Sequence, residues 1–364
     1  MLLYLHIPFC HRICPYCSFY KHTPGQTSIG RFIDALVTES AARIASSGQV
    51  PRTIYLGGGT PSMLSPAHLT KLFQGLKESI DFTQLDDVTM EANPATFDEK
   101  KAALFTELGV TRTSLGIQSF APHVLKTLGR EHTPEEASAS VDMLRRTGMR
   151  SINIDLMFSI PGQSLEDWKQ TLQTAVSLEP QHISAYNLTY EEDTAFFESL
   201  RKGEMSQNED HDADHFHLAD ELLTQAGFDH YETSNYAQPD HHSTHNQGYW
   251  SGEDYLGLGP SAVSTVGMVR HKNIPDTAHY VSQIESIGNA IHESETIDEE
   301  AWRLERIALG LRTKEGIPLT LLDSEGKRRA LTLAEEGLAE MTETSLILVQ
   351  RGRALVDPIA AELV

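Results

Sequence analysis

The chain has 364 residues, which is long enough to bury a large hydrophobic core and to form one large domain with a smaller one. Its formal net charge is −22, with 51 acidic residues against 29 basic ones. This balance argues against non-specific binding to nucleic acid and against a polybasic membrane patch. No apolar run approaches the roughly 20 residues of a membrane span, and Leu2–Leu5 is too short for the core of a signal peptide.

All three cysteines lie within Cys10–Cys17, with the spacing C-x3-C-x2-C. An odd, clustered set cannot form a disulfide framework, so it indicates ligation of a metal or cluster in a reducing, cytoplasmic compartment. On spacing alone, an iron–sulfur cluster with one iron left free competes with an ordinary turn and with a redox-active Cys14–Cys17 pair. A structural zinc site also stays open, with His6 or His11 as the fourth ligand.

Short β-like runs alternate with amphipathic stretches after the first strand. The expected strands are 2–7, Thr53–Leu56, Val88–Glu91, Arg112–Gly116, Ser151–Asp155 and Ile183–Tyr190. The expected helices lie near Arg31–Ala45, Pro66–Ser79, Asp98–Leu108, Pro134–Thr147 and Ser164–Leu178. About six βα units in succession predict a parallel sheet, either open and doubly wound or closed toward a barrel.

Unusual residues follow these strands at the end where a barrel carries its chemistry. They are the cysteine loop, Gly57–Ser62, Glu91, Gln118, Asp155 and Thr189. The triglycine lets backbone approach a ligand and turns N–H groups toward an anion, or it forms a plain tight turn. Glu91 and Asp155 end apolar runs, where an unpaired carboxylate is costly, so we expect each to have a partner or ligand.

The cysteine spacing, with Tyr16 before the last cysteine, resembles the signature of the radical S-adenosylmethionine (SAM) superfamily. The resemblance implies a partial (β/α)6 TIM-like barrel and a [4Fe-4S] cluster on Cys10, Cys14 and Cys17, whose open iron chelates SAM. It also implies SAM contacts, with Tyr16 beside the adenine, Asp155 at the ribose and Arg130 near the carboxylate. The positions that match SAM-contacting residues are Tyr4, Tyr16, Gly58, Gly59, Thr60, Glu91, Gln118, Arg130, Asp155, Thr189 and Val263.

Residues 1–270 resemble one branch of that superfamily, the anaerobic coproporphyrinogen III oxidase-like proteins. The matching segments are Tyr4–Cys10, Gly57–Ser62, Ser114–Phe120, Asn153–Met157 and Pro161–Gln163. This branch contains a dehydrogenase, which decarboxylates two propionates of coproporphyrinogen III, and the HemW-type haem chaperones.

Three features favour the chaperones. The chain begins shortly before the cysteine loop, where the dehydrogenase has an extension, and Phe19 stands where the dehydrogenase has a further cysteine. His245–Trp250 matches the H-N-x-x-Y-W motif linked with haem binding. One feature favours the dehydrogenase instead. Pro260–Ser264 resembles the corresponding segment of the dehydrogenase, in which the position of Val263 contacts SAM. We therefore expect a protein that binds SAM, a cluster and haem, delivers haem to apo-haemoproteins and accepts electrons from a one-electron reductant, without turnover of coproporphyrinogen.

His245 is the candidate haem ligand. Imidazole is a common axial ligand of haem iron, and Tyr249 and Trp250 offer rings to pack on a porphyrin. The alternative is a solvated polar loop, because Asp240–His245 is rich in histidine.

Residues 275–364 are expected to form a separate, mostly helical domain. Ala301–Leu309 has helical spacing, and Gly337–Glu362 resembles a winged helix, with strands at Leu346–Val349 and Ala354–Val356. The acidic balance argues against a DNA reader. We expect this domain to pack over the barrel mouth or to dock a partner.

Overall fold

Six parallel strands form the centre of the computed structural model, which describes residues 1–25 and 27–364. These strands are β1 (Leu2–Ile7), β2 (Thr53–Gly58), β3 (Asp87–Ala92), β4 (Arg112–Gln118), β5 (Ser151–Phe158) and β6 (His182–Asn187), paired in chain order. The predicted partial barrel is confirmed, and each strand lies within a few residues of its predicted position. The sixth ends earlier than expected, so Thr189 follows β6 in the loop.

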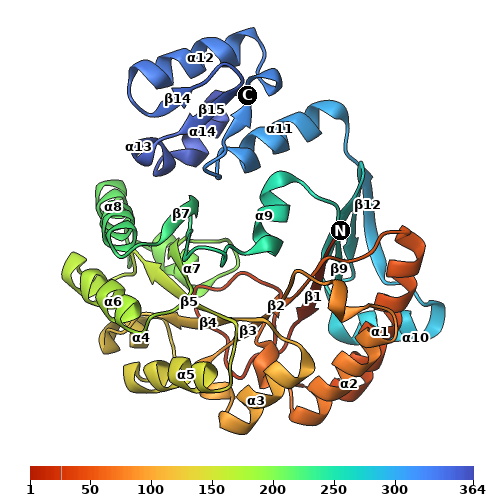
Figure 1. The fold of residues 1–364 in the computed structure, drawn as a ribbon. Helices are drawn as coiled ribbons and strands as arrows, with labels where there is room; N and C mark the ends of the chain where they lie inside the picture. The colour runs from red at the N-terminus through yellow and green to blue at the C-terminus, as the bar shows by residue number, and fades with distance from the viewer. Residues whose placement is uncertain (26) are drawn as a thin grey trace.

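Helices cover the outer face of these strands (Figure 1). They are α1 (Ile29–Ser47), α2 (Pro66–Lys77), α3 (Glu99–Leu108), α4 (Pro122–Thr127), α5 (Pro134–Arg146) and α6 (Leu165–Ser177). Alternate residues of β1 show how the layers form, because Leu3, Leu5 and Ile7 join the hydrophobic core beneath the helices, whereas Tyr4 and His6 line a cavity on the inner face. The expected N-cap of α5 is a full capping box between Thr133 and Glu136.

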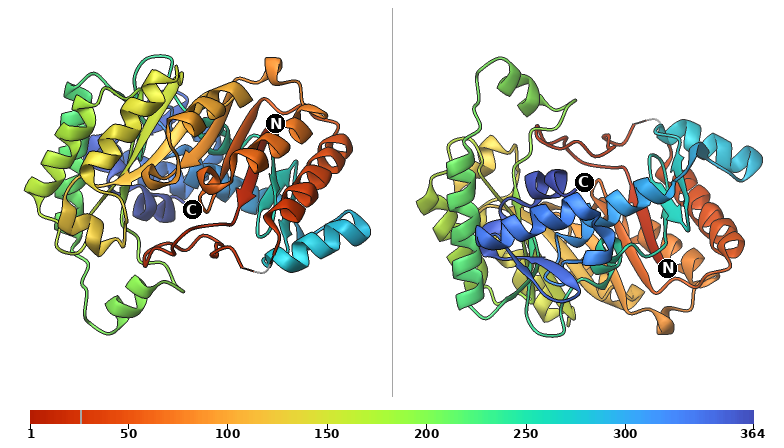
Figure 2. Two further views of the ribbon diagram at one scale, coloured as in Figure 1. Left: turned by 90° about the horizontal axis from the view of Figure 1, so that it is seen from below. Right: turned by 90° about the horizontal axis from the view of Figure 1, so that it is seen from above.

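The sheet extends at both edges beyond the six strands (Figure 1). Beside β6 it adds β8 (Asn235–Ala237) and β7 (Asp229–Glu232), and beside β1 it adds β9 (Tyr255–Leu258), β10 (Val263–Val266), β11 (Val269–Asn273) and β12 (Ile291–Thr296). Other helices of this part are α7 (Ala195–Arg201), α8 (Glu209–Gln225), α9 (Thr244–Ser251) and α10 (Thr277–Ile287). Figure 2 shows the red segment after β1 beside the green segment that carries α7, where Phe196 N–H donates to the Pro15 carbonyl at 3.1 Å.

The second domain begins later than the predicted residue 275. The large sheet continues through β12, and α10 packs against α1, so 275–296 belong to the barrel side. A second hydrophobic core gathers buried residues from Ile307 to Leu363. Its elements are α11 (Glu299–Gly310), β13 (Ile317–Pro318), α12 (Ser324–Glu335), β14 (Ala339–Met341), β15 (Ser345–Leu348), α13 (Gln350–Arg353) and α14 (Val356–Glu362).

One predicted strand of this domain is wrong. Ala354–Val356 was expected to be β, but Ala354 caps α13 and Val356 begins α14. The three-stranded sheet takes its third strand from Ala339–Met341 instead. No helix of the described residues is long and apolar enough to cross a membrane.

The second domain docks on α9 and on the β7 edge of the sheet (Figure 1). The Arg312 carbonyl accepts from Thr233 N–H at 2.8 Å, and Lys314 forms an ion pair with Asp229 at 2.5 Å. Residues that line the two cavities described below end at Val263, so no described residue of the second domain lines either cavity, and the alternative expectation, that this domain docks a partner, stays a prediction.

Candidate functional site

A cavity of about 900 Å³ opens at the carboxyl ends of the six parallel strands. It brings together most of the predicted site residues: Cys10, Cys14, Tyr16, Cys17, Gly58, Gly59, Thr60, Glu91, Gln118, Arg130, Asp155 and Thr189. We call it the cysteine cavity. Its composition follows from topology, because the ends of parallel strands meet along one edge.

The cysteine loop is fixed to the barrel while its thiols stay free. Cys10 N–H donates to the His22 carbonyl at 3.0 Å, and Cys17 N–H donates to the Cys14 carbonyl at 3.3 Å. All three cysteines are partly buried and unpaired. Burial raises the pKa of the Cys10 and Cys17 thiols.

Donors surround these sulfurs. The Thr60 hydroxyl lies 3.6 Å from Cys10 Sγ, and Arg130 Nη1 lies 3.7 Å from Cys14 Sγ. Hydrogen bonds and positive charge near thiolate sulfurs stabilise an anionic cluster.

His6 is not available as a fourth ligand for zinc. Its Nε2 bonds the Tyr20 carbonyl at 2.7 Å, and its Nδ1 bonds the Tyr4 hydroxyl at 3.0 Å. Burial lowers the pKa of His6 to about 4, so the ring is neutral at pH 7. Within residues 1–25 and 27–364, no three His, Cys, Asp or Glu side chains are grouped as ligands of a single metal ion.

The glycine turn after β2 packs directly under the cysteine loop. Gly58 has a φ of 101°, and a Cβ there would overlap the His6 ring, while one at Gly59 would lie 2.7 Å from the Ile7 and Phe9 carbonyl oxygens. The expectation that N–H groups of this turn face a ligand is wrong for three of them. Gly58 donates to Glu91, Gly59 to the Ile7 carbonyl and Thr60 to the Phe9 carbonyl.

Glu91 and Asp155 have only neutral partners. Glu91 accepts from the Tyr55 hydroxyl at 3.0 Å and from Gly58 N–H at 3.1 Å. Asp155 accepts from the Ser114 hydroxyl at 2.8 Å and from the Asn153 amide at 2.7 Å. Burial, and then repulsion by Asp155, raise the pKa of Glu91 to about 7. Burial also raises the pKa of Asp155. Two such acids facing a cavity favour a cationic or hydroxyl-bearing ligand.

Two buried polar atoms of residues that line the cysteine cavity lack a partner in the part of the chain that the structure describes. They are Oδ1 of Asn93 and Nε of Arg130, whose Nη2 donates to the Gly116 carbonyl at 2.5 Å. Gln118 has a φ of 71° next to an irregularity in the pairing of β4 with β5. Unsatisfied atoms and unfavourable backbone at one edge are typical of a ligand site.

A second cavity of about 510 Å³ adjoins the first one. It contains Tyr4 and Val263, which do not line the cysteine cavity, together with His245 and Tyr249. We call it the tyrosine cavity. Residues that line both cavities are Ser18, Phe19, Tyr55, Gly58, Glu91 and Asn246.

His245 lies in α9 and is 1 % exposed, so it does not belong to a solvated loop. Its Nδ1 bonds the Thr53 hydroxyl at 2.8 Å, and its Nε2 has no partner within residues 1–25 and 27–364. Burial lowers the pKa of His245 to about 3, which keeps the ring neutral. The Tyr249 ring packs edge-on at 4.9 Å between centroids. Trp250 lines neither cavity and instead packs near the Arg312 guanidinium at 5.8 Å.

Sequence reasoning missed Tyr55, which lines both cavities, orients Glu91 and lies 5.0 Å from the His245 ring. A signal was present in the alternation of β2, where Thr53, Tyr55 and Gly57 share the face opposite to Ile54 and Leu56.

Comparisons with known proteins agree with this geometry. A sequence model of the Radical SAM superfamily matches residues 4–175. In Escherichia coli, coproporphyrinogen III oxidase (HemN) has a structure that aligns with a TM-score of 0.85 over 100% of this chain and 89% of that chain, at 24% identity, which shows a shared fold.

Curated relatives align over nearly the whole chain. Heme chaperone HemW of Lactococcus lactis is 33% identical over 96% of this chain and 91% of its own length. Heme chaperone HemW of Mycobacterium tuberculosis is 34% identical over 99% of this chain and 94% of its own length. Sequence identity of this extent, on a radical SAM barrel with these cavities, shows that the chain belongs to the HemW family of the radical SAM superfamily.

Proposed function

We propose that this protein is a haem chaperone that holds a [4Fe-4S] cluster and SAM in the cysteine cavity and haem in the tyrosine cavity. It would pass haem to apo-haemoproteins in a reducing, cytoplasmic compartment, with a one-electron donor for the cluster. The observation that carries the proposal is His245, a neutral imidazole in the wall of the tyrosine cavity whose Nε2 has no partner among the described residues. The names of the curated relatives support the same reading.

The cluster would be held by Cys10, Cys14 and Cys17. When bound, it supplies one electron to SAM at its open iron. The chain's own contribution is the placement of Thr60 and Arg130 beside two of the sulfurs. The glycine turn fixes the loop by leaving no room for side chains beneath it.

SAM would lie between the cysteine loop and the two acids. Glu91 and Asp155 would accept from its amino and hydroxyl groups, and the Arg130 guanidinium, whose Nε has no partner among the described residues, would bind its carboxylate. Tyr16 lines the same cavity and offers its ring to the adenine.

Haem would enter the tyrosine cavity, where the rings of Tyr4, Tyr55 and Tyr249 provide flat apolar surface with polar ends. Nε2 of His245 is covered in this conformation, so coordination would require the neighbouring Tyr249 ring to move aside.

A haem titration of anaerobically purified protein tests the proposal. We expect a Soret band that saturates with one haem per chain, and His245→Ala should bind haem at least tenfold more weakly. His241→Ala is the matched control, because this neighbouring histidine lines neither cavity. Parental haem binding by His245→Ala would remove His245 as the ligand, and a parent that binds no haem would refute the function.

The competing function is dehydrogenation of coproporphyrinogen III, which the shared fold with HemN does not exclude. Incubation of the reconstituted protein with coproporphyrinogen III, SAM and a reductant should yield no protoporphyrinogen. Iron and sulfide analysis of the same preparation separates both functions from a zinc-stabilised module, which would contain zinc alone.

A further inference from the structure

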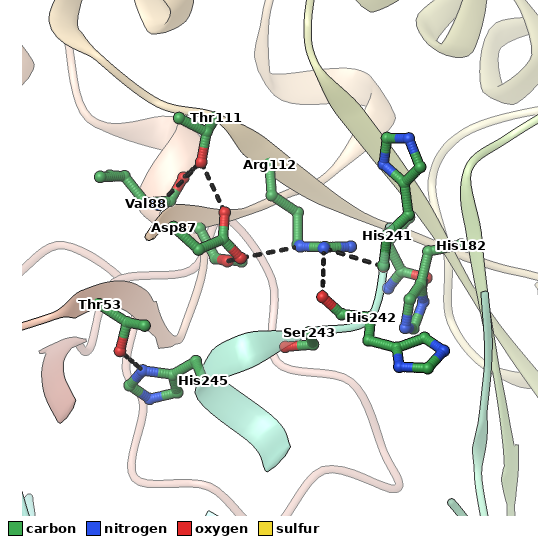
Figure 3. Close-up of polar contacts among 12 residues, drawn as sticks. Thr53, Asp87, Val88, Thr111, Arg112, His182, His241, His242, Ser243 and His245 are labelled. Atoms are coloured by element: carbon green, nitrogen blue, oxygen red, sulfur yellow. Dashed lines mark hydrogen bonds and ion pairs between the residues drawn. The ribbon is translucent and has the colours of Figure 1, made fainter. Parts of the chain in front are cut away.

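The amino-terminal ends of the parallel strands form a second polar layer, far from the cysteine loop. We call this layer the barrel floor; its residues are Thr53, Asp87, Arg112, His182 and His245 (Figure 3). All five are buried. Buried polar groups are costly unless they are paired. The hydrogen bonds of each floor residue therefore show which partner satisfies its side chain.

Asp87, the only carboxylate among these five residues, forms its hydrogen bonds with partners other than His245. Asp87 accepts from Arg112 Nε at 3.0 Å and from the Thr111 hydroxyl at 2.5 Å. Arg112 Nη2 donates to the carbonyls of His241 and His242, at 3.0 Å each, and so holds the segment that leads into α9 (Figure 3).

His182 is likewise satisfied at both nitrogens. Its Nδ1 bonds Asn153 Oδ1 at 2.6 Å, and its Nε2 bonds the Tyr231 hydroxyl at 2.8 Å. His245 differs from it, since one nitrogen bonds Thr53 and the other has no partner. Figure 3 shows Thr53, on β2, as the partner of the His245 ring.

We propose that Thr53 is a positioning residue that holds His245 through Nδ1 and leaves Nε2 as a neutral, weakly donating ligand for haem iron. This inference rests on the proposed function. A partner on the far nitrogen fixes the orientation and tautomer of a ligating histidine, and a carboxylate partner makes the imidazole a stronger donor than a hydroxyl does. The floor pairs its carboxylate with Arg112 and gives His245 a hydroxyl instead.

The choice of partner suits a carrier that must release its cargo. An iron–imidazole bond supported only by a hydroxyl is weaker than one supported by a carboxylate, so haem leaves more readily. Thr53 itself lines neither cavity, so its effect on haem acts through His245.

The test is Thr53→Val, which removes the hydroxyl and keeps the shape and the β-branched fit to the strand. We expect haem affinity to fall about 10- to 100-fold. The iron–histidine stretching frequency of ferrous haem, measured by resonance Raman spectroscopy, should also drop. Thr53→Ser keeps the hydroxyl and should restore most of both values.

Thr113→Val is the matched control. Thr113 is fully buried on β4, a parallel strand of the same sheet, and its hydroxyl has no partner among the described residues, so the same substitution removes a buried hydroxyl without touching His245. It should bind haem like the parent. Iron content and SAM affinity, measured on every variant, report whether the barrel is intact. Should Thr53→Val fail to fold, Thr53→Ala against Thr53→Ser makes the same comparison.

The outcomes separate the two proposals. Parental affinity and stretching frequency in Thr53→Val, with haem binding lost in His245→Ala, would overturn the role of Thr53 and leave the chaperone function standing. An equal loss in Thr113→Val would overturn it too. If the parent binds no haem, the chaperone function fails, and the role of Thr53 fails with it.

Discussion

The two ends of the barrel contain similar polar residues, but these residues differ in how completely their polar atoms are paired. At the carboxyl ends of the strands, Glu91 and Asp155 lack a cation, and Asn93 and Arg130 each have an unpaired atom. At the amino ends, Asp87 and Arg112 pair with each other, and His182 is saturated. Polar residues alone therefore do not mark a ligand site. Incomplete pairing together with a place in a cavity wall does: at the floor, Nη1 of Arg112 and Nε2 of His245 both lack a partner among the described residues, but only His245 lines a cavity.

Among the variants that test this comparison, loss of one cluster ligand should have the largest effect. We expect Cys14→Ser to lose essentially all cluster iron and its visible absorbance, because two remaining thiolates do not hold the cubane. Iron and sulfide assays after anaerobic reconstitution measure the effect. Ser18→Ala, a substitution in the same loop, should keep the parental iron content, and full iron retention in Cys14→Ser would contradict the ligand assignment.

Breaking the floor should cost stability instead of cofactors. Arg112→Met leaves Asp87 as a buried, unpaired charge, which typically costs about 3–5 kcal/mol. The free energy of unfolding from urea denaturation measures it. The double variant Asp87→Asn with Arg112→Met should recover part of the loss, and an unchanged midpoint in Arg112→Met would show that the pair is not buried in solution.

Glu91 should make SAM binding depend on pH. Its pKa is about 7 in the folded protein, and the ionised form accepts hydrogen bonds and attracts the sulfonium charge of SAM. SAM affinity should therefore fall as the pH drops below about 7, by up to about tenfold per unit. Glu91→Gln should bind SAM more weakly at pH 8 and lose this dependence. Calorimetry at several pH values measures both, and an equally steep profile in Glu91→Gln would assign the titration to another group.

The same carboxyl has the opposite effect on the SAM-free fold. Its folded pKa is raised above the reference value of 4.5, so it favours folding when protonated, and that contribution is lost as the pH rises through about 7. At pH 8, SAM-free Glu91→Gln should be more stable than the parent by about 1 kcal/mol in urea. A less stable variant would show that the bonds from Tyr55 and Gly58 outweigh the burial of charge.

The smallest effect should come from the contact between the domains. The Arg312 guanidinium lies 5.8 Å from the Trp250 ring, a geometry worth about 0.5–1 kcal/mol. A double-mutant cycle of Arg312→Gln and Trp250→Phe should give a coupling energy in that range and leave iron content unchanged. A coupling of zero would show that the two side chains do not interact in solution.

Much of the cysteine cavity was predictable, since it follows from local signals. Strand alternation placed β1 to β6, and a single topological rule brought their carboxyl ends to one edge. The failures involve contacts distant in sequence. For His245 the sequence left a solvated loop open as the alternative to a haem ligand, because its buried partner, Thr53, is 192 residues away. The domain boundary was set too early because nothing local shows that β12 pairs with β11.

Short apolar stretches also limited the prediction of secondary structure. Ala354–Val356 has strand-like residues, but three residues cannot separate a strand from the start of a helix, and here α14 begins at Val356. The described residues of this domain form helices with a three-stranded sheet, in the order β13, β15, β14, and the winged-helix resemblance stays a prediction.

The shared wall of the two cavities has a thermodynamic consequence. Tyr55, Gly58, Glu91 and Asn246 face both of them, so a molecule in one chamber changes the side chains that meet a molecule in the other. If binding of SAM changes the affinity for haem by some factor, binding of haem must change the affinity for SAM by the same factor. Under the proposed function, the binding of haem and the binding of SAM would therefore be linked by one coupling free energy.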